Sequence, residues 1–262
     1  MRGDRHATTQ GAIRPRDDVR AMFDRIVPRY DLMNRLMTGG RDVAWRRLAV
    51  REALRGRDPA EVRILDVATG TGDLALALRS AGATDVVGLD FSASMLVEAI
   101  RKEAAADGDQ RVSWVEGDAM SLPCADESFE AVTVAFGLRN MPSYPAALGE
   151  MWRVLRPGGT LVCLETTPLQ APMLRAVFDW YFARVVPMVG GMLSGDADAY
   201  RYLPASATAF PDADALGQMM LEAGFSRVRY LRRGLGTVAL HVATKADVDR
   251  SDEPTMQSGT RL

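Results

Sequence analysis

Two acidic residues flank a pair of glycines in residues 64–73, which read ILDVATGTGD. An apolar run carries Asp66 near its carboxyl end, Gly70 and Gly72 turn the chain, and Asp73 opens a segment of helical composition. This succession of strand, glycine turn and helix is typical of the start of a nucleotide-binding α/β sheet. The first glycine permits a tight turn, and the second lets a ligand approach bare backbone. The stretch therefore predicts a ligand site whose specificity depends on the residues around it.

The charges around this turn distinguish two classes of ligand. Gly70, Gly72 and Ala75 match the dinucleotide fingerprint. A pyrophosphate would occupy the amino end of the following helix, because the free amides and the helix dipole attract anions, but Asp73 at that place would repel it. S-adenosylmethionine has no phosphate and carries a sulfonium and an ammonium, which suit a loop flanked by Asp66 and Asp73. The turn therefore favours this methyl donor over a dinucleotide.

Two further acids are expected at the same edge of the sheet. Residues 84–90 (TDVVGLD) predict a second strand ending at Asp90, where one carboxylate can accept both hydroxyls of a ribose. Asp118 follows a third predicted strand and could accept a hydrogen bond from an adenine amino group, or it could simply form a turn. The amide of Ala119 could reach an adenine ring nitrogen.

Alternating strands and helices must position these residues. Five predicted strands, the last at residues 160–165, imply a parallel, doubly wound α/β sheet with right-handed crossovers. Residues 228–231 and 237–243 predict a closing hairpin whose last strand starts at the cofactor edge. His241 would lie deeper on that strand, in a structural role. Arg139 and its neighbours follow the fourth strand, at the edge where such sheets bind ligands.

Four segments lie outside this sheet. Residues 19–58 predict amphipathic helices, the first of which ends or kinks at Pro28. These helices either cover one side of the sheet or roof the cofactor pocket. Residues 166–212 hold apolar and aromatic side chains but no clear strand, which suggests core packing, a helical lid over an apolar substrate, or a surface that touches a membrane. Residues 1–18 and 246–262 are polar and are expected to be disordered.

Composition excludes several classes of protein. The chain of 262 residues has a net charge of -2, which gives no reason to propose a nucleic-acid partner. Cys124 and Cys163 lack metal-ligand spacing, so we expect reduced thiols in a cytosolic protein and no bound metal. No apolar run reaches the roughly 18 residues of a membrane span, and residues 1–9 have no apolar signal core.

Residues 19–245 resemble the ubiquinone/menaquinone C-methyltransferase family, the demethylmenaquinone methyltransferases. The matching blocks are FDRIVPRYDLMNRLMTGGRDVAWRR, LDVATGTGDLALAL, FGLRNMPSYPAALGEMWRVLRPGG, GDADAYRYLPAS and GTVALH. The resemblance implies one domain with a class I, Rossmann-like methyltransferase fold of seven strands, the last antiparallel. It implies S-adenosylmethionine as cofactor and places cofactor contacts at Thr71, Asp90, Asp118 and Ala119.

The resemblance also implies a prenylated aromatic diol as substrate, methylated at a ring carbon. We expect demethylmenaquinol to be converted to menaquinol, the last step of menaquinone biosynthesis. The alternative substrate is 2-polyprenyl-6-methoxy-1,4-benzoquinol of ubiquinone biosynthesis. We expect a cytoplasmic enzyme that could contact the inner face of the membrane peripherally and could form a homodimer through the closing hairpin.

The reaction indicates what the remaining residues must do. The acceptor must be aligned with the methyl group, and a ring hydroxyl must lose its proton before the ring carbon can attack. Arg139 could hold the resulting phenolate, directly or through a water, and Asn140 could orient the ring oxygen. Alternatively, Arg139 only fixes the lid by pairing with Asp31 or Asp198.

Tyr30, Tyr200 and Arg201 are further candidates, for shaping the substrate pocket. Two rival functions stay open. A nicotinamide-dependent oxidoreductase would need room for phosphate at the loop and a catalytic acid, yet no Tyr-x-x-x-Lys pair is present and Lys102 and Lys245 are the only lysines. A non-catalytic subunit of a quinone-synthesis complex would not need the intact glycine loop, acid and FGLRN block.

Overall fold

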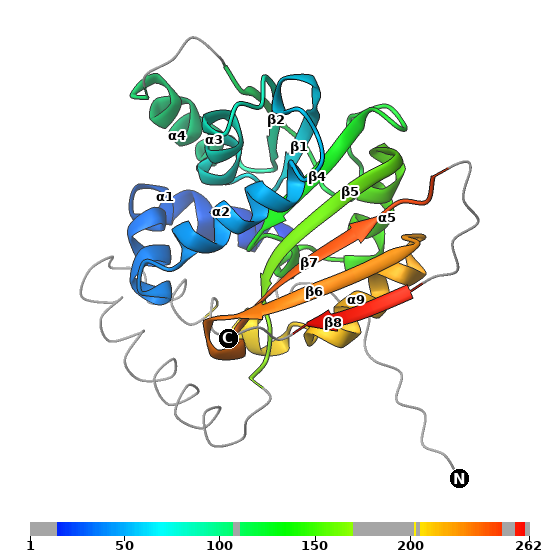
Figure 1. Cartoon of the computed structure of the whole chain (residues 1–262). Coiled ribbons are helices and arrows are strands. Elements are labelled where there is room, and N and C mark those ends of the chain that lie inside the picture. Colours follow the sequence, from blue (N-terminus) through cyan, green and yellow to red (C-terminus); the bar gives the residue numbers. More distant parts are fainter. Residues whose placement is uncertain (1–14, 107–110, 170–201, 203–204, 248–254, 260–262) are drawn as a thin grey trace.

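One mixed sheet organises the computed structural model, which describes residues 15–106, 111–169, 202, 205–247 and 255–259 (Figure 1). The strand order is β3-β2-β1-β4-β5-β7-β6-β8. Strands β1 to β5 pair in parallel, whereas β7 is antiparallel to β5 and β6. The strands are β1 (Arg63–Val67), β2 (Asp85–Asp90), β3 (Ser113–Glu116), β4 (Phe129–Ala135), β5 (Leu155–Thr166), β6 (Arg227–Arg233), β7 (Val238–Thr244) and β8 (Thr255–Gly259).

Helices cover both faces of this sheet (Figure 1). Helices α2 and α3 pack on one face, and α5 and α9 pack on the other. The helices are α1 (Arg16–Thr38), α2 (Asp42–Ala53), α3 (Asp73–Ser80), α4 (Ala93–Ala104), α5 (Tyr144–Val154) and α9 (Ala213–Glu222), with short 3-10 turns η1 (Pro59–Glu61), η2 (Leu138–Asn140) and η4 (Gly234–Gly236).

Each face of the sheet has its own apolar core. On β1, Ile64 packs with α2 and α3, and Leu65 packs with α5. Because both faces are covered, the central strands are apolar almost throughout, as in other buried parallel sheets. The expected doubly wound sheet and its antiparallel closing hairpin are therefore confirmed.

The two N-terminal helices do different jobs. α2 covers the sheet, whereas α1 packs along α4 and reaches the ligand cleft described below. α1 does not end at Pro28, where the sequence predicts an end or a kink. An interior proline removes one helical hydrogen bond at a cost of about 3 kcal/mol. Packing of Phe23 and Ile26 against Met95 and Tyr202 offsets this cost.

The carboxyl-terminal tail differs from the prediction. Residues 255–259 were expected to be disordered but form β8, which pairs in parallel with β6. Without β8, the backbone groups of β6 would lie unpaired at the sheet edge. The tail sequence itself does not reveal that it pairs with this edge.

Most of the expected lid lies outside the described residues. Within the described part of the chain, no helix is long and apolar enough to cross a membrane.

One tryptophan explains two of the glycines near the predicted site. The Trp114 ring on β3 lies 2.6 Å from the position that a Cβ would take at Gly88 and equally close to that of Gly72. Its indole nitrogen donates to the Glu103 carboxylate at 3.1 Å, which fixes the ring over both backbones. The missing Cβ of Gly72 thus accommodates Trp114, and not the ligand that the sequence suggested.

Replacing Gly88 by alanine should therefore destabilise the protein. The new methyl group meets a ring that is held by its own hydrogen bond, and such overpacking lowers the free energy of unfolding by about 2 kcal/mol. The matched control is Gly149→Ala in α5, where no atom lies within 4 Å of the new Cβ and helix propensity predicts a gain of about 0.5 kcal/mol. Urea denaturation of both variants measures the difference; equal stabilities would contradict the packing argument.

Candidate active site

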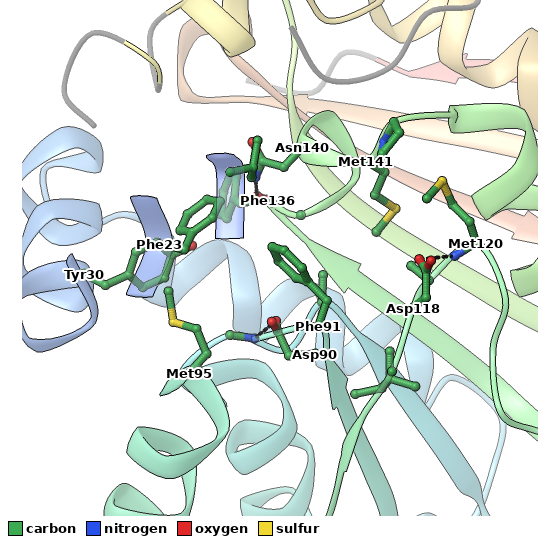
Figure 2. Close-up of a pocket in the computed structure, with 18 residues that line it drawn as sticks. Phe23, Tyr30, Asp90, Phe91, Met95, Asp118, Met120, Phe136, Asn140 and Met141 are labelled. Carbon is green, nitrogen blue, oxygen red and sulfur yellow. Dashed lines mark hydrogen bonds between the residues drawn. The ribbon is translucent and has the colours of Figure 1, made fainter. Parts of the chain in front are cut away.

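A cleft opens at the carboxyl ends of the parallel strands, between α1 and the loops that follow β1, β2, β3 and β4 (Figure 2). The cleft encloses about 70 Å³, or about 720 Å³ when the space at its open mouth is included. Phe23 and Tyr30 of α1 form one wall, opposite Met120 and Met141 (Figure 2). Predicted site residues that line it are Tyr30, Gly70, Asp90, Asp118, Ala119 and Asn140.

Asp90 is held in place by the backbone around it. One carboxylate oxygen accepts from the Gly70 amide at 2.8 Å, and the other accepts from the Ser92 amide at 2.9 Å. Burial raises the pKa of Asp90 to about 6, although these amide hydrogen bonds lower it. The site therefore offers a pre-positioned pair of acceptor oxygens beside the glycine turn, as two vicinal ribose hydroxyls require.

Asp66 fixes the same turn from below. Its carboxylate accepts from the Thr69 and Thr133 hydroxyls, each at 2.6 Å, and burial raises its pKa to about 6. Asp66 is 1% exposed. It therefore ties β1 to β4 and does not act as an open acidic flank of the loop.

Asp73 also differs from the expected open flank. Its carboxylate is bound by the Lys102 ammonium, and the Arg46 guanidinium lies 3.0 Å away. Lys102 also binds Asp31 of α1 at 2.8 Å, and Asp31 accepts from the Thr71 hydroxyl at 2.6 Å. Because two cations neutralise Asp73, the attraction that the sequence argument assigned to it is largely cancelled. The carboxylate nevertheless still occupies the amino end of α3, where a pyrophosphate would bind.

This charge network was not predicted. It joins one residue from each of four helices around the glycine turn, namely Asp31, Arg46, Asp73 and Lys102. The only available signal was that Lys102 is one of two lysines in an arginine-rich chain. Thr71, expected to contact the cofactor, lies within this network, and a second small cavity beside the turn is lined by Thr71, Tyr30 and Arg46.

The loop after β3 carries the two residues expected at an adenine. The Asp118 carboxylate accepts from the Met120 amide at 3.0 Å, and Asp118 pairs with Ser121 in an isolated bridge (Figure 2). Asp118 is thus a turn residue and also lines the cleft, as Ala119 does. The two readings of Asp118 are compatible.

Arg139 and Asn140 lie on η2, directly after β4. Asn140 lines the cleft, and its Oδ1 is buried with no hydrogen-bond partner among the described residues. The Arg139 guanidinium donates to the Glu165 carboxylate at 2.6 Å and to the Phe136 carbonyl at 2.7 Å. Burial lowers the pKa of Arg139, but the attraction of Glu165, Tyr30 and Tyr202 and the hydrogen bond to Glu165 together outweigh burial, and the net direction is upward.

Of the two alternative partners expected for Arg139, Asp31 does not pair with it. Asp31 binds Lys102 and Thr71, and Asp198 lies outside the described residues. Glu165, the partner in the structure, was read only as the end of a strand. Tyr200 and Arg201 also lie outside the described residues.

Backbone strain is concentrated beside Arg139. Ala68 and Phe136 follow β1 and β4 and adopt left-handed conformations, with φ of 52° and 57°. Such values are unfavourable for residues other than glycine and commonly mark functional sites. A Cβ at Gly137 would lie 2.5 Å from that of Ala68, so the two strand ends are pressed together at the floor of the cleft.

The strand order, the antiparallel β7 and the Asp90 carboxylate facing the glycine turn define a class I S-adenosylmethionine-dependent methyltransferase. A crystal structure from Thermotoga maritima, described as a SAM-dependent methyltransferase and possible histamine N-methyltransferase, matches with a TM-score of 0.61. The match covers 87% of this chain and 99% of that chain at 20% identity, and it shows the fold alone. The fold class expected from the sequence is confirmed.

The chain belongs to the ubiE/COQ5 methyltransferase family, whose model matches residues 11–245. It is 51% identical over 225 residues to the demethylmenaquinone methyltransferase of Thermus thermophilus, covering 86% of this chain and 100% of that relative. It is 43% identical over 229 residues to the ubiquinone/menaquinone biosynthesis C-methyltransferase UbiE of Paracoccus denitrificans, covering 87% and 90%. The family resemblance is confirmed, and with it S-adenosylmethionine as cofactor.

The described residues fit this cofactor. A Cβ at Gly70 would meet only Tyr30, at 3.8 Å, so bare backbone is open to the cleft there. Asp90 presents two acceptor oxygens at the glycine turn, and Asp118 and Ala119 line the same cleft. The unpartnered Oδ1 of Asn140 is left for whatever binds beside the cofactor.

Affinity for S-adenosylmethionine should depend on pH through Asp90. The ribose hydroxyls need the carboxylate form, so affinity should be full above the pKa of about 6 and fall as the pH drops through it. Calorimetric titration between pH 5 and 8 measures this dependence. Asp90→Asn should bind S-adenosylmethionine about tenfold more weakly, and its affinity should depend less on pH. Asp66→Asn should keep the pH dependence of the parent protein. An unchanged profile in Asp90→Asn would assign the dependence elsewhere.

The ion pair of Arg139 and Glu165 can be tested by a double-mutant cycle. Glu165→Gln leaves a buried guanidinium without its anion and should lower the free energy of unfolding by about 3 kcal/mol. Arg139→Met combined with Glu165→Leu removes both charges and should cost less than Glu165→Gln alone. Denaturant unfolding measures the parent, Glu165→Gln, the double variant and its two single changes, Arg139→Met and Glu165→Leu. A double variant as unstable as the sum of its single changes would show that the two side chains act independently.

Proposed function

We propose that this methyltransferase transfers the methyl group of S-adenosylmethionine to a ring carbon of a prenylated quinol, converting demethylmenaquinol to menaquinol. A relative matched over its full length at 51% identity is named a demethylmenaquinone methyltransferase. The observation that carries the chemistry is geometric: Asn140 lines the cleft with a buried Oδ1 that has no hydrogen-bond partner among the described residues, and it directly follows Arg139 on η2.

The residues divide the reaction between them. The bound cofactor supplies the methyl group on a sulfonium, which is a good leaving group. Asn140 orients the ring by accepting a hydrogen bond from a ring hydroxyl at Oδ1, and Arg139 stabilises the oxyanion by its charge. Glu165 acts through Arg139 as a positioning residue, because it holds the guanidinium at 2.6 Å. The aromatic and methionine walls exclude water from the ring.

Tyr30 also belongs to this assignment. Its ring lies 3.8 Å from the position that a Cβ would take at Gly70, on the wall that α1 contributes to the cleft. Its hydroxyl also interacts electrostatically with Arg139. Its position suits contact with both cofactor and ring. For Tyr200 and Arg201, a role in shaping the substrate pocket rests on the family blocks alone.

The ring itself is the finer question. Conversion of 2-polyprenyl-6-methoxy-1,4-benzoquinol is the second candidate, because the Paracoccus denitrificans relative is named for both ubiquinone and menaquinone biosynthesis. A nicotinamide-dependent oxidoreductase is disfavoured by Asp73 at the amino end of α3. A non-catalytic subunit is disfavoured by the intact, strained floor of the cleft. We further propose a cytoplasmic location, peripheral contact with the inner face of the membrane, and a homodimer.

The assignment is tested with purified protein, labelled S-adenosylmethionine and the two reduced quinols. The labelled methyl group should appear on the naphthoquinol ring, with slower transfer to the benzoquinol. In cells lacking the gene, the menaquinone without its ring methyl should accumulate. An unchanged quinone profile would remove the assignment.

Asn140→Ala separates chemistry from cofactor binding. Losing the group that positions the ring should lower kcat about 100-fold, while the Kd for S-adenosylmethionine changes less than about twofold. Arg139→Lys keeps the charge but loses the planar fork and should retain more activity than Asn140→Ala. Equal kcat in Asn140→Ala and the parent protein would exclude the proposed role.

A further inference from the structure

The turn between β6 and β7 exposes a large apolar side chain. Leu235 lies between Gly234 and Gly236 and is 79% exposed. Its φ of 58° is in the left-handed region, which is unfavourable for leucine. Neither burial within the described residues nor backbone preference accounts for a leucine here, so this side chain is available to an apolar partner.

The turn lies at the same edge of the sheet as the cleft. Val238, the first residue of β7, pairs with Thr166, the last residue of β5. The carboxyl ends of the parallel strands, with Asp90 and Asn140, meet at that edge. The turn also packs closely on α2, because the Trp45 ring lies 2.9 Å from the position that a Cβ would take at Gly234.

A basic surface leads from this turn along β6 and α2. On β6, Val228 is buried and Tyr230 donates a hydrogen bond to Asp214 of α9, so these two side chains lie on the α9 face of the sheet. The alternate side chains, Arg229, Leu231 and Arg233, lie on the opposite face. They form with α2 a groove that we call the basic groove, lined by Leu48, Arg51, Glu52, Arg55, Arg229, Leu231 and Arg233.

Charge in the basic groove is unbalanced. It holds four arginines and one glutamate, and Glu52 binds both Arg55 and Arg229. The chain as a whole has a net charge of -2, so the excess of positive charge is local. The outer face of α2 extends it with Arg47, which is exposed and one helical turn before Arg51.

We propose that the Leu235 turn and the basic groove dock this protein onto a membrane surface of acidic phospholipids. The proposal rests on the proposed function, because a prenylated quinol resides in the bilayer and would enter the cleft from there. Basic side chains beside exposed apolar ones are the pattern of interfacial binding, in which charges meet anionic headgroups and apolar groups enter the acyl boundary. A nucleic acid would use the arginines but would give Leu235 no apolar partner.

Sedimentation with lipid vesicles tests the surface. The full chain should bind vesicles containing about one third phosphatidylglycerol and should not bind pure phosphatidylcholine vesicles. Leu235→Asn should weaken binding about tenfold, and because asparagine tolerates the left-handed region, thermal stability should not fall. Arg51→Gln combined with Arg233→Gln should weaken binding at least as much. The control, Arg101→Gln combined with Arg111→Gln, removes the same charge from α4 and the segment before β3 and should bind like the parent.

Three outcomes would overturn the proposal: equal binding to neutral and acidic vesicles, equal losses in the control variant, or binding of RNA in place of vesicles. Activity separates this surface from the proposed function. With a water-soluble quinol that carries one prenyl unit, Leu235→Asn should match the parent protein. With a long-chain quinol in acidic vesicles, its rate should fall about tenfold, as its vesicle binding does. If the parent methylates neither quinol but still binds vesicles, the proposed function fails and the docking surface remains.

Discussion

The Lys102 ammonium joins three helices that the rest of the site depends on. It binds Asp31 on α1 and Asp73 on α3 from its own position on α4, and Arg46 of α2 shares Asp73. α1 has no place in the sheet, so its position over the cleft depends on this network and on the small apolar cluster along α4. Because the pairs are mostly shielded from water, their attraction is screened less than that of surface pairs. The cleft wall that carries Tyr30 follows from them.

At the floor of the cleft, by contrast, charged and polar groups are buried at a cost in free energy, because they lose hydration. Asp66 and Asp90 lose hydration, and burial raises the pKa of each to about 6. Arg139 is compensated by Glu165, by the Phe136 carbonyl and by the Phe136 ring, whose centroid lies 5.9 Å from its Cζ. Two residues in left-handed conformations hold the strand ends together. Stability is therefore lower here than apolar packing would allow, and the polar groups are pre-positioned for a ligand and a developing oxyanion.

Sequence periodicity and turn chemistry were sufficient for most of the sheet. Buried parallel strands, a glycine turn and an acid at the end of β2 are local features, and each strand type has its own pattern. Asp90, Asp118, Ala119 and Asn140 could be placed at one edge because parallel strands end there. The edge strand β8 could not be predicted from the sequence, since TMQSG has no strong pattern. It pairs only because β6 offers an open edge.

The sequence by itself determined the fold class, the family and the acids at the strand ends, because these depend on residues close together in the chain. Only the tertiary structure decided which charges meet. Lys102 lies 71 residues from Asp31, and Arg139 lies 26 residues from Glu165. The role of Gly72 changed in the same way, because Trp114 on another strand occupies the space beside it. Contacts between distant segments depend on how elements pack, and no local pattern records that.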